Sequence, residues 1–161
     1  MPDMALKPVP LANFIDASGA VYEIDTDKAR LDLGVIHQFL TRSHWAAGID
    51  RARVERSIQH SLAFGLYREG VEIGFARVVS DHATFAYLAD VFVLEDYRDQ
   101  GLGTWLVQTI LAFPALQGMR RWLLGTRDAH RLYRRCGFGE PPPPFAFLER
   151  LNPTSDIKDQ G

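Results

Sequence analysis

The spacing of apolar residues changes along the chain and divides its first half into helical and extended segments. Apolar side chains recur every three or four positions in residues 33–43 and 49–62, which predicts two amphipathic helices. Asp50 is a suitable N-cap for the second of these helices. In residues 62–81 the period falls to two and residues 69–70 interrupt the alternation, which predicts a β-hairpin with its turn at this point.

The second half begins with a segment that is apolar at almost every position, residues 83–94. This pattern predicts a central strand covered by helices on both faces. A helix is expected over residues 102–113, where Pro114 stops it. The other expected elements are strands at 20–27, 119–126 and 145–151 and a short helix at 127–138 that Gly137 ends.

The order of these elements predicts a single α/β domain over residues 1–161. An antiparallel hairpin followed by a βαβ unit gives a mixed sheet covered by helices. Residues 1–17 and 152–161 are rich in Pro, Asp, Ser and Lys, so we expect them to be loose tails.

Composition narrows the class of protein. With 47% hydrophobic residues the chain is typical of a globular domain, and its net charge of −2 gives no basic field, so we expect no nucleic-acid partner. No apolar run approaches the roughly 18 residues of a membrane span, and residues 1–19 do not resemble a signal peptide. The one cysteine, Cys136, cannot form an internal disulfide. We therefore expect a cytoplasmic protein without membrane association.

Two glycines one residue apart lie where the central strand passes into the next helix, in the stretch "EDYRDQGLGTWL". A Walker loop is excluded because Thr104, not lysine, follows Gly103, and a dinucleotide loop is excluded because Leu106 occupies the third glycine position. The remaining pattern, Arg98-x-x-Gly101-x-Gly103 before a helix, suits an anion at the helix N-terminus. Glycine at both positions removes side chains that would hold a pyrophosphate away.

The segment "LADVFVLEDYRDQGLGTWLV" closely resembles the acetyl-coenzyme A segment of the GNAT superfamily of N-acetyltransferases, and "DAHRLYRRCGF" resembles its second signature, L-Y-x-x-x-G-F. The resemblance implies the GNAT fold, an α/β (α+β) domain with a mixed, mostly antiparallel sheet of about six to seven strands and about four helices. It also implies transfer of the acetyl group of acetyl-CoA to a primary amine by direct attack in a ternary complex. No metal is expected, since the five histidines are scattered without ligand spacing.

The resemblance also implies where acetyl-CoA binds. The backbone of the central strand pairs with the pantetheine arm, and that strand splays from its neighbour to leave room. One position departs from the family, because Thr126 stands where many members have an asparagine that contacts the arm. The residues implied are Val91, Phe92 and Val93 for the arm, and Arg98, Asp99, Gln100, Gly101, Leu102, Gly103 and Thr104 for the pyrophosphate.

Acetyl transfer needs a neutral amine, a donor to the oxyanion and a proton for the leaving thiolate. The resemblance assigns the proton to Tyr133; the alternative is a packing tyrosine on an amphipathic helix. Asp90 is a lone carboxylate within an apolar strand, where burial without a partner is costly. It either takes a proton from the amine or holds a cationic substrate, or it is a structural carboxylate satisfied by an arginine or by backbone N–H groups.

Two aromatic residues are expected near the acceptor amine. Tyr87 lies near the position of a catalytic carboxylate in some family members, and we interpret it as a substrate contact. Trp45 lies between the first two helices, where it borders the acceptor cleft of the family or packs as a core or lid residue. The sequence leaves open a non-catalytic acyl-CoA-binding module, the identity of the amine (small molecule or peptide) and a homodimer, which is common in the family.

Overall fold

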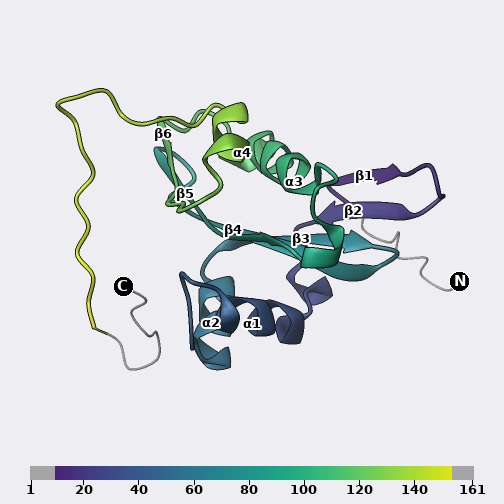
Figure 1. The fold of residues 1–161 in the computed structure, drawn as a ribbon. Helices are drawn as coiled ribbons and strands as arrows, with labels where there is room; N and C mark the ends of the chain where they lie inside the picture. Colours follow the sequence, from purple (N-terminus) through teal and green to yellow (C-terminus); the bar gives the residue numbers. More distant parts are fainter. Residues whose placement is uncertain (1–9, 154–161) are drawn as a thin grey trace, which may run out of the picture.

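The computed structural model describes residues 10–153, and they form a sheet whose six strands lie side by side in chain order (Figure 1). All neighbouring strands are antiparallel except β5 and β6, which are parallel. The prediction of a mixed, mostly antiparallel sheet is therefore confirmed. The strands are β1 Ala12–Ile15, β2 Val21–Asp25, β3 Leu62–Arg68, β4 Val71–Ser80, β5 Phe85–Val93 and β6 Arg121–Leu123.

Four α-helices cover the two faces of this sheet. Helices α1 (Leu33–Arg42) and α2 (Arg51–Gln59) lie on one face, and α3 (Leu102–Leu111) and α4 (His130–Arg135) lie on the other (Figure 1). The predicted N-cap of α2 is confirmed, because Asp50 accepts a hydrogen bond from the Arg53 N–H at 2.7 Å. Short 3₁₀ turns occur at Lys28–Arg30, Glu95–Tyr97 and Pro114–Leu116.

Each face of the sheet has its own hydrophobic core. Phe64 and Leu66 of β3 pack with Leu106 and Ile110 of α3, all fully buried. On the opposite face, Ile36, Leu40, Val54 and Ile58 of α1 and α2 pack against Phe75 and Phe92. The central strands are therefore covered on both sides, as the apolar run of residues 83–94 predicts.

Two predictions about the ends of the chain are wrong. Residues 12–15, placed in a loose tail, form the edge strand β1, where Phe14 stacks on Tyr22 at 4.7 Å between ring centroids. Residues 145–151, expected as the last strand, belong to no strand of the structure. The rest of both predicted tails, residues 1–9 and 154–161, lies outside the described residues.

Candidate active site

The sheet opens between β5 and β6. These strands pair only where Phe85, Ala86 and Tyr87 face residues 121–123, and no described residue pairs with that edge of β5 beyond Tyr87. A β-bulge accompanies the opening. The two residue steps from Phe75 to Arg77 on β4 lie opposite three residue steps on β5, so β5 carries one extra residue here. Asp90, within this bulge, adopts a left-handed φ of 55°. A bulge increases local twist and redirects a strand. The backbone of residues 91–93 is consequently left without a strand neighbour on one side.

The glycine loop ends at the first turn of α3, close to this free edge. Gly101 is the N-cap with a φ of 79°, and no side chain caps the helix. The first N–H groups of α3 therefore lack an intrahelical acceptor, and a Cβ at Gly101 would meet no atom within 4 Å. The two glycines differ, because a Cβ at Gly103 would lie 3.1 Å from Leu132 Cδ1. Gly103 thus also permits close packing of α3 against α4.

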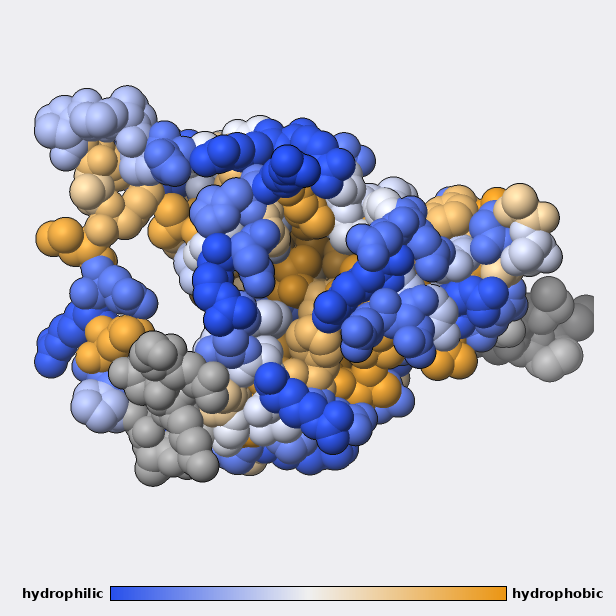
Figure 2. Space-filling view, in the orientation of Figure 1, coloured by the Kyte–Doolittle hydropathy of each residue, from blue (hydrophilic) through white to orange (hydrophobic). Residues whose placement is uncertain are grey.

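A cleft of about 670 Å³ joins the free edge of β5, the glycine loop, the end of α1 and the face of α4. Figure 2 shows it as an apolar hollow bounded by hydrophilic side chains, between α3 and α4 on one side and α1 on the other. Its lining includes the predicted residues Trp45, Val91, Phe92, Val93, Arg98, Asp99, Gly101, Leu102, Gly103, Thr104 and Tyr133.

Basic side chains line the same cleft. Arg98 Nε donates to the Val93 carbonyl at 2.9 Å and ties the loop to the strand. Arg127, which precedes α4, and Arg135, the last residue of α4, also line the cleft, together with Arg42 at the end of α1. The sequence interpretation missed Arg42, because a basic residue in the last turn of a helix is common and carries no motif. The cleft can attract an anionic ligand at its loop end.

Tyr133 forms part of the cleft wall. It also lines a second hollow of about 550 Å³ on the β6 side, so Tyr133 borders both spaces. The ring contacts Phe138 edge-to-face at 6.0 Å between centroids. Burial, with the nearby groups of Cys136 and Asp128, raises the pKa of Tyr133 to about 12. Its hydroxyl therefore keeps its proton at neutral pH.

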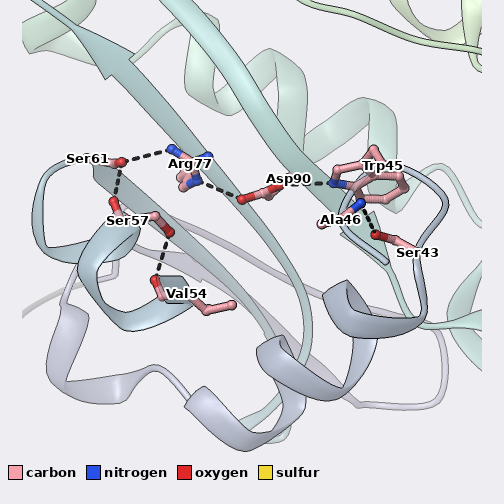
Figure 3. Close-up of polar contacts among 8 residues, drawn as sticks. All are labelled: Ser43, Trp45, Ala46, Val54, Ser57, Ser61, Arg77 and Asp90. Carbon is pink, nitrogen blue, oxygen red and sulfur yellow. Dashed lines mark hydrogen bonds and ion pairs between the residues drawn. The ribbon is translucent and has the colours of Figure 1, made fainter. Parts of the chain in front are cut away.

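Asp90 is held in a chain of polar contacts (Figure 3). Its Oδ2 accepts from Arg77 Nε at 2.7 Å, and its Oδ1 accepts from Trp45 Nε1 at 2.9 Å. Arg77 also donates to Ser61 Oγ at 3.2 Å. The Asp90 side chain is only 11% exposed. This is the arrangement expected of a structural carboxylate satisfied by an arginine, and it fixes Trp45 at the cleft.

Four predicted site residues do not line the cleft: Asp90, Gln100, Tyr87 and Thr126. Gln100 is exposed in the loop, and Tyr87 is 36% exposed where β5 pairs with β6. Thr126 lines the second hollow, and its Oγ1 accepts from the Ala129 N–H at 3.0 Å, just before α4. Its hydroxyl thus organises the start of that helix.

Within residues 10–153, no group of three or more His, Cys, Asp and Glu side chains is arranged to hold a metal ion. No helix in this part of the chain has the length and apolar character needed to span a bilayer.

Comparison with known proteins supports a common ancestry for this architecture. The sequence profile of the Acetyltransferase (GNAT) family matches residues 21–138. A candidate acetyltransferase from Gibberella zeae is 30% identical over 135 residues, which cover 70% of this chain and 75% of that protein.

Solved structures agree with the sequence match. The crystal structure of a candidate GNAT acetyltransferase from Xanthomonas campestris pv. campestris is 47% identical, with a TM-score of 0.78 over 82% of this chain and 94% of that one. Aminoglycoside N-acetyltransferase AAC(6')-Iy in complex with CoA is 20% identical, with a TM-score of 0.57 over 89% of this chain and 100% of that one, and shares the fold. The chain belongs to the Acetyltransferase (GNAT) family.

Proposed function

We propose that the protein is an N-acetyltransferase that moves the acetyl group of acetyl-CoA to a primary amine by direct attack in a ternary complex. One observation carries the proposal: a single cleft joins an uncapped helix N-terminus, a free strand edge and Tyr133. These three features suit a pyrophosphate, an amide-bearing arm and a departing thiolate, respectively. The aminoglycoside enzyme of the same fold, solved with CoA, supports this assignment.

The residues fit the donor molecule. The open space beside Gly101 and the unbonded N–H groups of α3 suit a pyrophosphate, and Arg98 adds positive charge. The unpaired edge at residues 91–93 presents backbone groups to the amides of the pantetheine arm, in the manner of an added strand. When bound, acetyl-CoA supplies an activated acetyl thioester.

Tyr133 acts on the leaving sulfur in this proposal. Its pKa of about 12 keeps the hydroxyl protonated and ready to donate. A thiol has a pKa of about 8.5, so complete proton transfer from the phenol is uphill. We therefore assign to Tyr133 a hydrogen bond that strengthens as charge develops on the sulfur, which is a transition-state interaction.

Asp90 has a positioning role in this proposal. Both of its carboxylate oxygens already accept hydrogen bonds, one from Arg77 and one from Trp45. The amine then loses its proton to water, and Trp45 with Phe39 shapes the acceptor end of the cleft. We assign to these aromatic side chains the selection of the acceptor amine, which is a small molecule or a peptide.

The engagement of Asp90 favours a second candidate function, a non-catalytic acyl-CoA-binding module, because it leaves the predicted base without a free oxygen. Incubating the protein with labelled acetyl-CoA and a panel of polyamines, amino acids, aminoglycosides and peptides separates the two. We expect acetylated product from at least one class of amine. Tight binding of CoA without any product would favour the module.

Tyr133→Phe tests the chemistry directly. The chemical step should slow by about 10²-fold, the usual scale for losing one hydrogen-bond donor to charge that develops in the transition state, while affinity for acetyl-CoA stays the same because the ring is retained. The step is best measured in a single turnover with the best amine found, so that product release does not hide the effect. A wild-type rate for that step would make Tyr133 a packing residue.

A further inference from the structure

His44 follows α1 and lies at the acceptor end of the cleft, beside Trp45. Its ring meets the Trp45 indole edge-on, at 5.1 Å between centroids, and its side chain lines the cleft. The residue is half-buried, and neither of its ring nitrogens forms a hydrogen bond within residues 10–153. A neutral imidazole keeps a lone pair on one nitrogen, so this ring can accept a proton from a group in the cleft.

The surroundings of His44 hold its ring in place. Trp45 Nε1 donates to Asp90 Oδ1 at 2.9 Å, which fixes the indole against which the imidazole packs (Figure 3). The backbone is held as well, because the buried Ser43 accepts a hydrogen bond from the Ala46 N–H through its Oγ, at 3.1 Å. The imidazole is therefore positioned at the cleft by its neighbours.

The carboxylates near the cleft are less suited to accept a proton from the amine. Both oxygens of Asp90 already accept hydrogen bonds. Asp128 lies before α4 and pairs with Arg127, with atoms 3.8 Å apart. Asp99 belongs to the glycine loop, the end of the cleft assigned to the pyrophosphate. Among the residues that the structure describes, His44 is the one histidine of the cleft lining, and histidine is the side chain that ordinarily exchanges a proton near neutral pH.

The remaining charged groups of the cleft are basic, and they act on the acceptor. A protonated amine beside guanidinium groups is disfavoured relative to a neutral amine. A primary amine titrates at about 10.4, so at neutral pH it arrives mostly as the ammonium. The reaction therefore needs a proton acceptor close to the amine. The other charged or titratable residues of the lining are Tyr97, Tyr133, Arg42, Arg98, Arg127 and Arg135.

We propose that His44 is the proton acceptor of the acetyl transfer, an inference that rests on the proposed function. The water that takes a proton from the ammonium passes a proton to the imidazole, and the neutral amine then attacks the acetyl carbonyl. The C–N bond forms, the C–S bond breaks, and the departing thiolate takes the second amine proton. The imidazolium afterwards returns its proton to solvent, so one proton is released for each acetyl group transferred.

His44→Gln tests the assignment in single turnovers with the best amine found in the panel. Glutamine keeps a polar side chain of similar size but accepts no proton at neutral pH. The chemical step at pH 7 should slow by about 10²-fold, within the usual range for a general base, while the affinity for acetyl-CoA stays the same. His60→Gln is the matched control, since His60 is exposed at the end of α2 and does not line the cleft. Equal rates in His44→Gln and wild type would overturn the proposal.

The pH profile separates a proton acceptor from a residue that only shapes the cleft. In the wild type kcat/KM should level off above about pH 7, where an imidazole is neutral. Without the acceptor only the small neutral fraction of the amine reacts, so kcat/KM of His44→Gln should rise about tenfold per pH unit toward the pKa of the amine. Profiles that differ by a constant ratio would make His44 a packing residue, against the proposal.

Chemical rescue gives a readout that packing alone does not change. His44→Ala leaves space beside Trp45, and imidazole added to the solution should raise the rate of this variant at pH 7 by about tenfold or more. Pyrazole has the same shape but is a much weaker base, so it should restore little. Equal effects of the two compounds, or no recovery with imidazole, would contradict proton transfer to His44.

The same experiments keep two kinds of failure apart. If no amine of the panel is acetylated, the proposed function fails, and the role of His44 fails with it. If product forms and the His44 variants react at the wild-type rate, the acetyl transfer stands and only the assignment of His44 is overturned.

Discussion

At the scale of single residues, Asp90 combines an unusual backbone with a fully engaged side chain. Its left-handed φ of 55° lies at the bulge of β5, and its carboxylate joins Arg77 of β4 to Trp45 at the cleft. Left-handed backbone at a non-glycine residue persists where surrounding contacts hold it. Here those contacts are an ion pair and a hydrogen bond to an indole. Asp90 therefore connects the shape of the sheet opening to the placement of an aromatic wall.

A double-mutant cycle measures this connection. Arg77→Ala, Asp90→Ala and the double variant should give a coupling free energy of unfolding of about 1–3 kcal/mol, because the pair is largely shielded from water. The exposed pair Arg127–Asp128, with its atoms 3.8 Å apart, is the control and should give about 0–0.5 kcal/mol. Equal coupling in both cycles would show that Asp90 contributes no more than a surface ion pair.

Glu72 is a second residue whose environment determines its charge. It is 4% exposed, and its Oε1 accepts from the Asp32 N–H at 2.6 Å, while Oε2 has no hydrogen-bond partner among the described residues. Burial, opposed by this hydrogen bond and assisted by the Asp32 charge, raises the pKa of Glu72 to about 8. The folded protein thus keeps a proton that the unfolded chain releases above its ordinary pKa of 4.5.

The free energy of unfolding should therefore fall as pH rises from about 4.5 to about 8, by an amount on the order of 3–5 kcal/mol from this group. Glu72→Gln keeps the acceptor for the Asp32 N–H and removes the titration, so its stability should exceed that of the wild type increasingly toward pH 8. Urea unfolding at several pH values checks this, with Glu55→Gln on the exposed face of α2 as control. Parallel stability curves for Glu72→Gln and wild type would contradict the protonated state.

At the scale of elements, the glycine loop depends on how closely α3 approaches α4. A Cβ at Gly103 would lie 3.1 Å from Leu132 Cδ1, so a side chain there presses on α4 as well as on the loop end of the cleft. Gly103→Ala should weaken CoA binding with little loss of stability, because the end of the Leu132 side chain can shift. Gly103→Val should weaken binding at least tenfold and cost about 1–3 kcal/mol of stability by overpacking. Calorimetry and thermal unfolding separate the two effects; unchanged affinity in both variants would place the phosphates elsewhere.

Most elements follow from local patterns in the sequence. The periodicity of residues 33–43 and 49–62 and the turn at residues 69–70 correspond to α1, α2 and the β3–β4 hairpin, since the apolar periodicity of each element reflects burial against a hydrophobic core. The edge strand β1 was missed because only four residues pair and most of their side chains are exposed. The pattern of residues 145–151 is strand-like, but a strand forms only where backbone groups pair with a neighbouring edge, and no described residue pairs with this segment.

The residues of the site could be predicted from the sequence where a motif fixes the backbone conformation, and not where tertiary contacts determine the position of a side chain. Gly101 and Gly103 and the strand before them line the cleft as expected, because an uncapped helix N-terminus is a local feature. The partners of Asp90 come from β4 and from the segment after α1, which no local pattern specifies. Arg42 reaches the cleft only because α1 packs across the sheet from α4.

At the scale of the whole molecule, the cleft lies where two separate cores meet. Phe39 and Arg42 on α1 belong to one face of the sheet, and Leu132 and Tyr133 on α4 belong to the other. The opening between β5 and β6 connects the two faces. A ligand that fills this opening contacts both layers and replaces the missing strand neighbour of residues 91–93. Binding should therefore stabilise the whole domain and not only the loop.

Acetyl-CoA at 100 times its dissociation constant should raise the free energy of unfolding by about 2.7 kcal/mol, because it binds the folded state alone. Thermal unfolding should show the shift, and hydrogen exchange should show new protection at residues 91–93, the unpaired part of β5. NAD at the same concentration is the matched control, since it carries an adenosine and a pyrophosphate but no pantetheine arm. It should leave the amides of residues 91–93 unprotected and raise the melting temperature much less. A larger stabilisation by NAD than by acetyl-CoA would mean that the cleft recognises the nucleotide alone, and the assignment of the β5 edge to the pantetheine arm would be wrong.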